Sequence, residues 1–138
     1  MTLARTLAVA LALFLAGAAP PAIPPTPGQL MDSAWRVTTI DGRAPVSQRA
    51  VIRFLGNRLS ASAGCNGLGG TWRLQGSRLV GGPFISTMMF CEGVMEQERA
   101  MADLLGSRPK ISIQRGLMQL QGGGHRLEAR RLPGASRP

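Results

Sequence analysis

The segments AGCNGLGGTW (residues 63–72) and ISTMMFC (residues 85–91) carry the strongest structural signal in this chain. In the first segment, Gly64, Asn66 and Gly67 are residue types that tolerate a positive φ, so the chain is predicted to leave a strand here through a sharp turn. The Asn66 side chain can also hydrogen-bond to nearby backbone and hold that turn in place.

Each segment contributes one of the two cysteines of the chain, Cys65 and Cys91. If the chain is exported, an even pair in a small domain usually forms a disulfide, and closing the loop of residues 66–90 would stabilise the fold by roughly 3 kcal/mol. The alternatives are a reactive thiol, which needs a base although His125 is the sole histidine, and a zinc site. A zinc site needs about four ligands, and the sequence offers no convincing set. We therefore expect a structural disulfide and no metal or cofactor.

The residues around and after the second cysteine have the apolar periodicity of a helix, predicted over 91–105 with the charged residues mostly on its other side. Gly106 and Pro109 end this helix. Ser86 and Thr87 precede it, where their hydroxyl groups either cap its free N–H groups or bond back to the turn.

Apolar and polar residues alternate elsewhere in the chain, between turn residues, in the manner of strands. The predicted order is five strands, the helix, and three strands. Their ranges are 34–40, 51–55, 58–62, 70–74 and 78–80, then 110–114, 117–121 and 126–130. This order predicts an α+β fold in which the helix packs against a curled antiparallel sheet.

These segments resemble the META domain, the family of the bacterial heat-shock protein HslJ. Its hallmarks are a Gly-Cys-Asn segment that leads to a glycine and an aromatic residue, an S-T-x-M-x-C segment, and an opening strand with a tryptophan such as Trp35. The resemblance covers about residues 30–132. Two positions depart from the family: Trp72, where tyrosine is commoner, and Phe90, where a small residue is commoner.

The resemblance implies an antiparallel sheet curled into a partial barrel around one inserted helix. It implies no enzymatic activity and no cofactor, and it associates the chain with envelope stress, antibiotic tolerance and, in some members, motility or secretion. Envelope members are often lipoproteins. This chain has no cysteine in or just after its first apolar run, so no lipid anchor is expected.

The N-terminus has the pattern of a cleaved signal peptide, predicted over residues 1–18: Arg5, an apolar run over 7–15, and small residues over 16–18. An uncleaved membrane anchor is the alternative, but a helix needs roughly 20 apolar residues to span a bilayer. A Pro-rich linker (19–29), one domain (30–132) and a fraying tail (133–138) are expected to follow. The expected protein is periplasmic or secreted, soluble after cleavage, and without a membrane span.

The chain is strongly basic, with 16 Lys and Arg against 7 Asp and Glu and a formal net charge of +9. Such a surface can bind nucleic acid, anionic lipid headgroups or acidic polymers. The arginines are scattered, however, and only residues 125–131 resemble a cluster. Aromatic residues make up 4% and tyrosine is absent, which leaves few platforms for stacking bases, so nucleic acid is not expected as a partner.

Three polar residues of the hallmark segments, Asn66, Ser86 and Thr87, are candidate ligand residues. Their side chains either hold the turn, which we favour, or form a polar site at a helix N-terminus that suits an anion. The methionines allow a similar choice, because methionine fills irregular cores and also lines adaptable apolar pockets. The residues concerned are Met88, Met89, Met95, Met101 and Met118, with Phe84, Phe90 and Leu105 as possible neighbours; core packing is the expectation.

We therefore expect a non-enzymatic envelope protein that supports the stress response by binding a partner protein or an amphiphile. The alternative is a structural interaction module that docks another envelope or secretion component through edge strands or arginines. A hydrolase with Ser86 or Cys65 as nucleophile is a third and weaker hypothesis, because the chain has no G-x-S-x-G segment. His125, beside three glycines, is expected to be a solvated turn residue. The sequence leaves the oligomeric state and the identity of any ligand or partner open.

Overall fold

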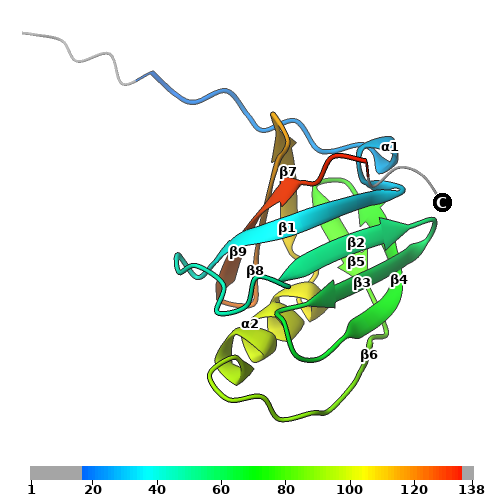
Figure 1. Cartoon of the computed structure of the whole chain (residues 1–138). Helices are drawn as coiled ribbons and strands as arrows, with labels where there is room; N and C mark the ends of the chain where they lie inside the picture. The colour runs from blue at the N-terminus through cyan, green and yellow to red at the C-terminus, as the bar shows by residue number, and fades with distance from the viewer. Residues whose placement is uncertain (1–16, 135–138) are drawn as a thin grey trace, which may run out of the picture.

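The computed structural model describes residues 17–134, in which strands of one antiparallel sheet surround a core and a helix lies beside it (Figure 1). The strands are β1 (Ser33–Ile40), β2 (Val51–Leu55), β3 (Arg58–Ser62), β4 (Leu68–Gln75), β5 (Arg78–Gly81), β6 (Ile85–Ser86), β7 (Lys110–Gln114), β8 (Leu117–Gly122) and β9 (His125–Arg131). The helices are α1 (Pro27–Leu30) and α2 (Met95–Gly106). Most of the predicted signal peptide and the last four residues of the predicted tail lie outside the described residues.

All strands except β6 close into a barrel, in the order β3-β2-β1-β9-β8-β7-β5-β4, with β4 pairing again with β3. The narrowest junction is that between β5 and β7, where Arg78 is paired with Lys110 alone. Two backbone hydrogen bonds, from Leu79 N–H to Pro109 O and from Ile111 N–H to Ser77 O, complete this junction. The expected partial barrel is therefore wrong: the sheet closes because β5 and β7, on either side of α2 in the sequence, pair with each other.

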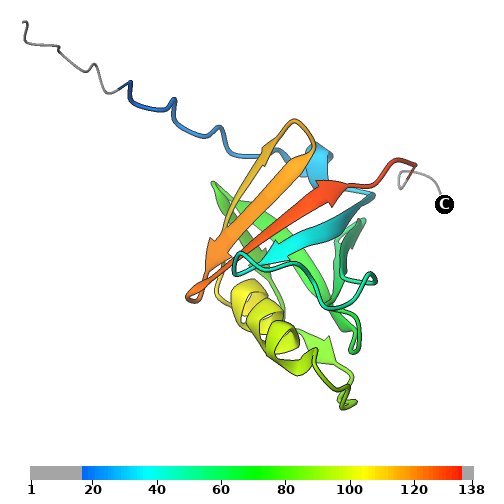
Figure 2. The same ribbon diagram turned by 60° about the vertical axis from the view of Figure 1, so that its left-hand side comes forward.

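The inward residues of the strands fill the barrel with apolar side chains, and α2 lies along one end of it (Figure 2). The fully buried side chains include Trp35, Ile52, Phe54, Leu59, Leu79, Met118, Leu120 and Leu127. The helix adds Ala100, Met101, Leu104 and Leu105 to this core. Helix α1 contributes Leu30 to the core at another part of the barrel. The Arg131 guanidinium lies 5.4 Å from the centre of the Trp35 ring.

Three elements differ from the sequence-based expectations. The helix begins at Met95 rather than at residue 91, because Gly93 has φ +81° and residues 92–94 form turns. The short strand β6 was not expected, and neither was α1, which falls partly in the expected linker. The α+β class is as expected, and so is the position of the long helix between β5 and β7, the fifth and sixth of the predicted strands. Neither helix described in residues 17–134 is long and apolar enough to cross a bilayer.

Candidate functional site

A disulfide between Cys65 and Cys91 joins the turn after β3 to the segment before α2. The two Cα atoms lie 6.1 Å apart. The predicted bond is thus present, and it fixes one end of the connection between β6 and α2 against the barrel. Neither cysteine carries a free thiol in this form.

Asn66, the residue after the first cysteine, is 6% exposed, and both its side-chain oxygen and its side-chain nitrogen form hydrogen bonds within the chain. Its Oδ1 accepts hydrogen bonds from the Met89 backbone N–H (2.7 Å) and the Thr87 hydroxyl (2.9 Å). Its Nδ2 donates to the Met89 carbonyl oxygen (2.9 Å). The amide therefore pairs with both backbone groups of Met89, as a neighbouring strand would, and fixes the middle of the loop between β6 and α2.

The other polar contacts between the turn after β3, the loop that follows β6 and helix α2 also lie within the chain. The Gly67 N–H donates to Thr87 Oγ1 and the Thr87 N–H donates to the Gly67 carbonyl, both at 3.1 Å. Glu98 Oε1, from α2, accepts the backbone N–H groups of Cys65 (2.9 Å) and Asn66 (2.8 Å). A carboxylate of the protein itself thus accepts the backbone N–H groups of this turn. These contacts favour the structural interpretation of the motif.

The two hydroxyl groups before the helix are not used as caps. Thr87 bonds back to the turn, and the Ser86 hydroxyl donates to the Thr87 carbonyl oxygen at 2.9 Å. Val94 stands at the N-cap of α2 and makes no side-chain capping bond. Of the two roles considered for Thr87, the bond to the turn is the one that the structure contains.

The segment that these contacts hold in place presents apolar side chains to solvent. The exposed fractions are 82% for Ile85, 95% for Met88, 63% for Met89 and 81% for Phe90. These four residues are referred to below as the apolar loop. The expectation of core packing is correct for Met101, Met118 and Leu105, which are buried. It is wrong for Met88, Met89 and Phe90, because the Asn66 amide holds this part of the backbone outside the barrel.

A groove of about 350 Å³ lies between the apolar loop and α2. Its apolar walls are Met88, Met89, Phe90, Met95 and Ala102, and its polar lining is Asn66, Ser86, Thr87, Glu98 and Arg99. The three polar residues singled out in the sequence therefore lie together, beside a mainly apolar groove. Sequence reasoning missed Glu98 and Arg99 as part of this site; their helical spacing from Met95 toward Ala102 was the available signal.

A family model described as the META domain matches residues 28–133. The chain belongs to the META domain family. Two structures determined by NMR are similar to it. The first has a TM-score of 0.69 at 20% identity, and the match covers 76% of this chain and 93% of the other chain. The second, from Burkholderia xenovorans, has a TM-score of 0.67 at 25% identity, and the match covers 91% of this chain and 99% of the other chain. No curated protein matches the chain.

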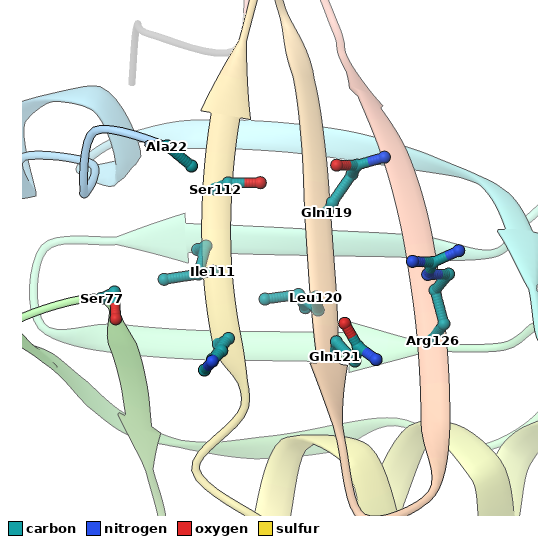
Figure 3. Close-up of a pocket in the computed structure, with 9 residues that line it drawn as sticks. Ala22, Ser77, Ile111, Ser112, Gln119, Leu120, Gln121 and Arg126 are labelled. Atoms are coloured by element: carbon teal, nitrogen blue, oxygen red, sulfur yellow. The ribbon is translucent and has the colours of Figure 1, made fainter. Parts of the chain in front are cut away.

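A second groove in this META domain, of about 310 Å³, lies on the outer face of β7, β8 and β9 (Figure 3). Figure 3 shows Ser112, Gln119 and Arg126 along three neighbouring strands, with Ala22 of the N-terminal segment nearby. Gln119 Nε2 donates to Glu128 Oε1 at 2.9 Å. This second groove is lined by amide, hydroxyl and cationic groups together with Ala22, Ile111 and Leu120, so it is more polar than the groove beside the apolar loop. Among residues 17–134, no group of three or more His, Cys, Asp and Glu is placed to hold a metal.

His125 lies between two carboxylates rather than free in solvent, which differs from the expected solvated turn residue. Its Nδ1 is 2.7 Å from Asp41 Oδ2, and its Nε2 is 3.9 Å from Asp103 Oδ2. The imidazole thereby connects the turn after β1 to α2. Neither Ser86 nor Cys65, the nucleophiles of the hydrolase hypothesis, is among its contacts.

Asp41 makes the stability of the contacts around His125 depend on pH. The backbone N–H of Arg126 is the main cause that lowers the pKa of Asp41 below its usual value, and the hydrogen bond and charge of His125 act in the same direction, against the smaller opposing effect of burial. A carboxyl group with a lowered pKa stabilises the fold while it is ionised, so this contribution is present at neutral pH and is lost as the pH falls through the folded pKa, below about 4. We expect Asp41→Asn to lower the urea midpoint at pH 7 and to lower it progressively less towards pH 2. A difference between the two proteins that does not change with pH would contradict this.

Proposed function

We propose that this META domain is a non-enzymatic binding module of the cell envelope, and that the apolar loop with its groove binds an amphiphile. The observation that carries the proposal is the exposure of three consecutive large apolar side chains, Met88, Met89 and Phe90, in a loop fixed to the barrel. Exposed apolar surface that is held in one place is typical of binding sites.

The loop is held in a way that keeps its apolar side chains in water. The disulfide at Cys91 fixes one end, β6 pairs with β4 at the other, and the Asn66 amide fixes Met89 between them. Burying a side chain of this size is worth roughly 1.5–3 kcal/mol, which a loose loop would gain by folding onto the barrel. Constraints that prevent this favour a loop whose apolar groups are covered by a ligand. Methionine suits the task because its flexible thioether adapts to acyl chains of different shape.

The charges of the groove favour an amphiphile with an acidic head. Arg99 lines the groove and is exposed, whereas Glu98 is engaged by the Cys65 and Asn66 N–H groups. A carboxylate or phosphate head group beside Arg99 would place the acyl chain along Met88, Phe90 and the apolar side of the groove. The disulfide and the signal-like N-terminus support export, and the family resemblance supports a role in envelope stress.

Changing Met88, Met89 and Phe90 together to serine tests the site. With a dansyl-labelled undecanoic acid as fluorescent probe, we expect the triple variant to lose at least tenfold in affinity, because about 0.8 kcal/mol is lost for each methylene group that is no longer buried. Its melting temperature should change little, since these side chains are exposed in the free protein. Val46→Ser, at an exposed apolar residue of the loop between β1 and β2, is the matched control and should bind as the unchanged protein does.

Equal probe affinity in the triple variant and the unchanged protein would reject the groove as the site.

The second candidate function is the docking of a protein partner on the same loop. If the unchanged protein does not bind the probe at all, a photo-crosslinking residue at position 88 in living cells tests this second candidate. The exposure of Phe90 supports that candidate as well, because aromatic residues are frequent at protein interfaces. A control crosslinker at position 114, on β7, should capture no common product.

A further inference from the structure

Much of the positive charge in the described part of the chain has no carboxylate partner. Within residues 17–134, the ion-pair contacts are those of His125, so no arginine or lysine there has a nitrogen within 4.0 Å of a carboxylate oxygen. The acidic residues gather elsewhere: five of the seven lie on α2, just before it, or against His125, namely Asp41, Glu92, Glu96, Glu98 and Asp103. The wall of the barrel away from α2 is therefore left with uncompensated arginines.

Three of these arginines line one groove of about 440 Å³ on the outer side of β1 and β2. Arg36 comes from β1, Arg49 from the loop before β2, and Arg53 from β2; they are referred to as the arginine groove. Ala50, Val51 and Leu132 contribute its apolar lining, and no acidic residue lines it. Arg36 Nη1 donates to the Gln48 carbonyl oxygen at 3.4 Å, which helps to keep this guanidinium over the groove.

The strand registers place further cations beside the groove. Arg130 on β9 lies directly opposite Arg36, and like charges at opposite positions destabilise a sheet. On β3, Arg58 lies opposite Leu55, which is 69% exposed and shares its face of β2 with Arg53. The strands β1, β2 and β3 lie side by side (Figure 1). Their outer face thus alternates arginines with an exposed leucine.

We propose that the arginine groove binds the phosphate groups of an anionic phospholipid surface. A guanidinium donates two parallel hydrogen bonds to a phosphate, and neighbouring strands about 4.8 Å apart present several such groups in one array. An array of this kind suits the many phosphates of a lipid surface, and Leu55 contributes the apolar contact that interfacial segments use. Bound phosphates also relieve the repulsion between Arg36 and Arg130. This surface is distinct from the apolar loop, and its function does not depend on that site.

The test is vesicle sedimentation of the full chain, with vesicles of phosphatidylglycerol and phosphatidylcholine compared with phosphatidylcholine alone. Every variant has the same N-terminal apolar run, so its contribution to binding cancels in the comparison. We expect stronger binding with phosphatidylglycerol than with phosphatidylcholine alone, and a smaller difference between the two at high salt. Arg36→Gln with Arg53→Gln should lower the partition coefficient about tenfold, because each basic residue near an anionic surface contributes up to about fivefold.

Two matched variants separate the groove from charge in general. Arg73→Gln with Lys110→Gln removes two exposed cations from β4 and β7 and should cost clearly less binding; an equal loss would overturn the proposal. Arg36→Lys with Arg53→Lys keeps the charge and should retain most of the binding. Circular dichroism and the melting temperature confirm that each variant is folded.

Three other outcomes would also reject a lipid surface. They are equal binding to phosphatidylcholine alone, full release of bound protein by millimolar inorganic phosphate at constant ionic strength, and tighter binding to a single-stranded oligonucleotide than to the vesicles. Inorganic phosphate would identify a small-anion site, and the oligonucleotide would identify a nucleic-acid site.

Discussion

Replacing both Cys65 and Cys91 with serine should lower the free energy of unfolding by about 3 kcal/mol, because the disulfide closes a loop with a sequence separation of 26. For a domain of this size, such a loss corresponds to a decrease in melting temperature of roughly 15 °C. Thermal unfolding followed by circular dichroism measures it. The effect arises in the unfolded state, which becomes less restricted without the bond.

Dithiothreitol provides the control for this change. It should lower the melting temperature of the unchanged protein by a similar amount and leave the double serine variant unaffected. If reduction does not change the melting temperature of the unchanged protein, the bond contributes nothing to stability. In that case, the apolar loop would be held by the Asn66 contacts alone.

Replacing Asn66 with alanine should cost about 3 kcal/mol, since three side-chain hydrogen bonds are lost at about 1 kcal/mol each. Two of them pair with the backbone of Met89, so the substitution should also free the apolar loop. We expect faster cleavage after Phe90 by chymotrypsin, together with a lower urea midpoint. The urea midpoint reports the stability that Asn66 contributes, and the cleavage rate reports whether Asn66 also holds the apolar loop in place.

Asn66→Asp is the control closest in size, because it keeps the acceptor for the Met89 N–H and the Thr87 hydroxyl. It replaces the donor to the Met89 carbonyl with a second oxygen and adds a negative charge at a position that is 6% exposed. It should therefore be destabilised at neutral pH and recover stability as the pH falls, because the protonated carboxyl group can again donate to the Met89 carbonyl. The alanine variant should show no such recovery. If Asn66→Ala unfolds at the same urea concentration as the unchanged protein, the amide does not hold the loop. The structural interpretation of the hallmark segment would then fail.

The sequence was sufficient to predict the elements that have a clear local pattern. The two-residue turn Gly56-Asn57 predicted the Val51–Leu55 and Arg58–Ser62 hairpin, and an even cysteine pair predicted the disulfide. The start of α2 was placed four residues too early, because residues 91–94 continue the apolar spacing of the helix while Gly93 adopts a positive φ. Periodicity reports which side chains could share a face, and it does not report where the backbone breaks.

Features that depend on distant contacts could not be predicted in this way. Barrel closure requires Arg78 to pair with Lys110, and no local pattern specifies that register. The exposure of Met88 and Phe90 contradicts the usual preference of these residues for the interior. It follows from the bonds of Asn66 to a residue far along the chain, which become visible only in three dimensions.

The position of the disulfide has a mechanical consequence. Strands β4, β5 and β6 lie inside a covalent ring that begins at Cys65 and ends at Cys91. If the oxidised chain is stretched by its two ends, force passes across the sulfur bridge and leaves the ring slack. The contour length at full extension is then shorter than that of the reduced chain by roughly 80 Å, as single-molecule force spectroscopy would register.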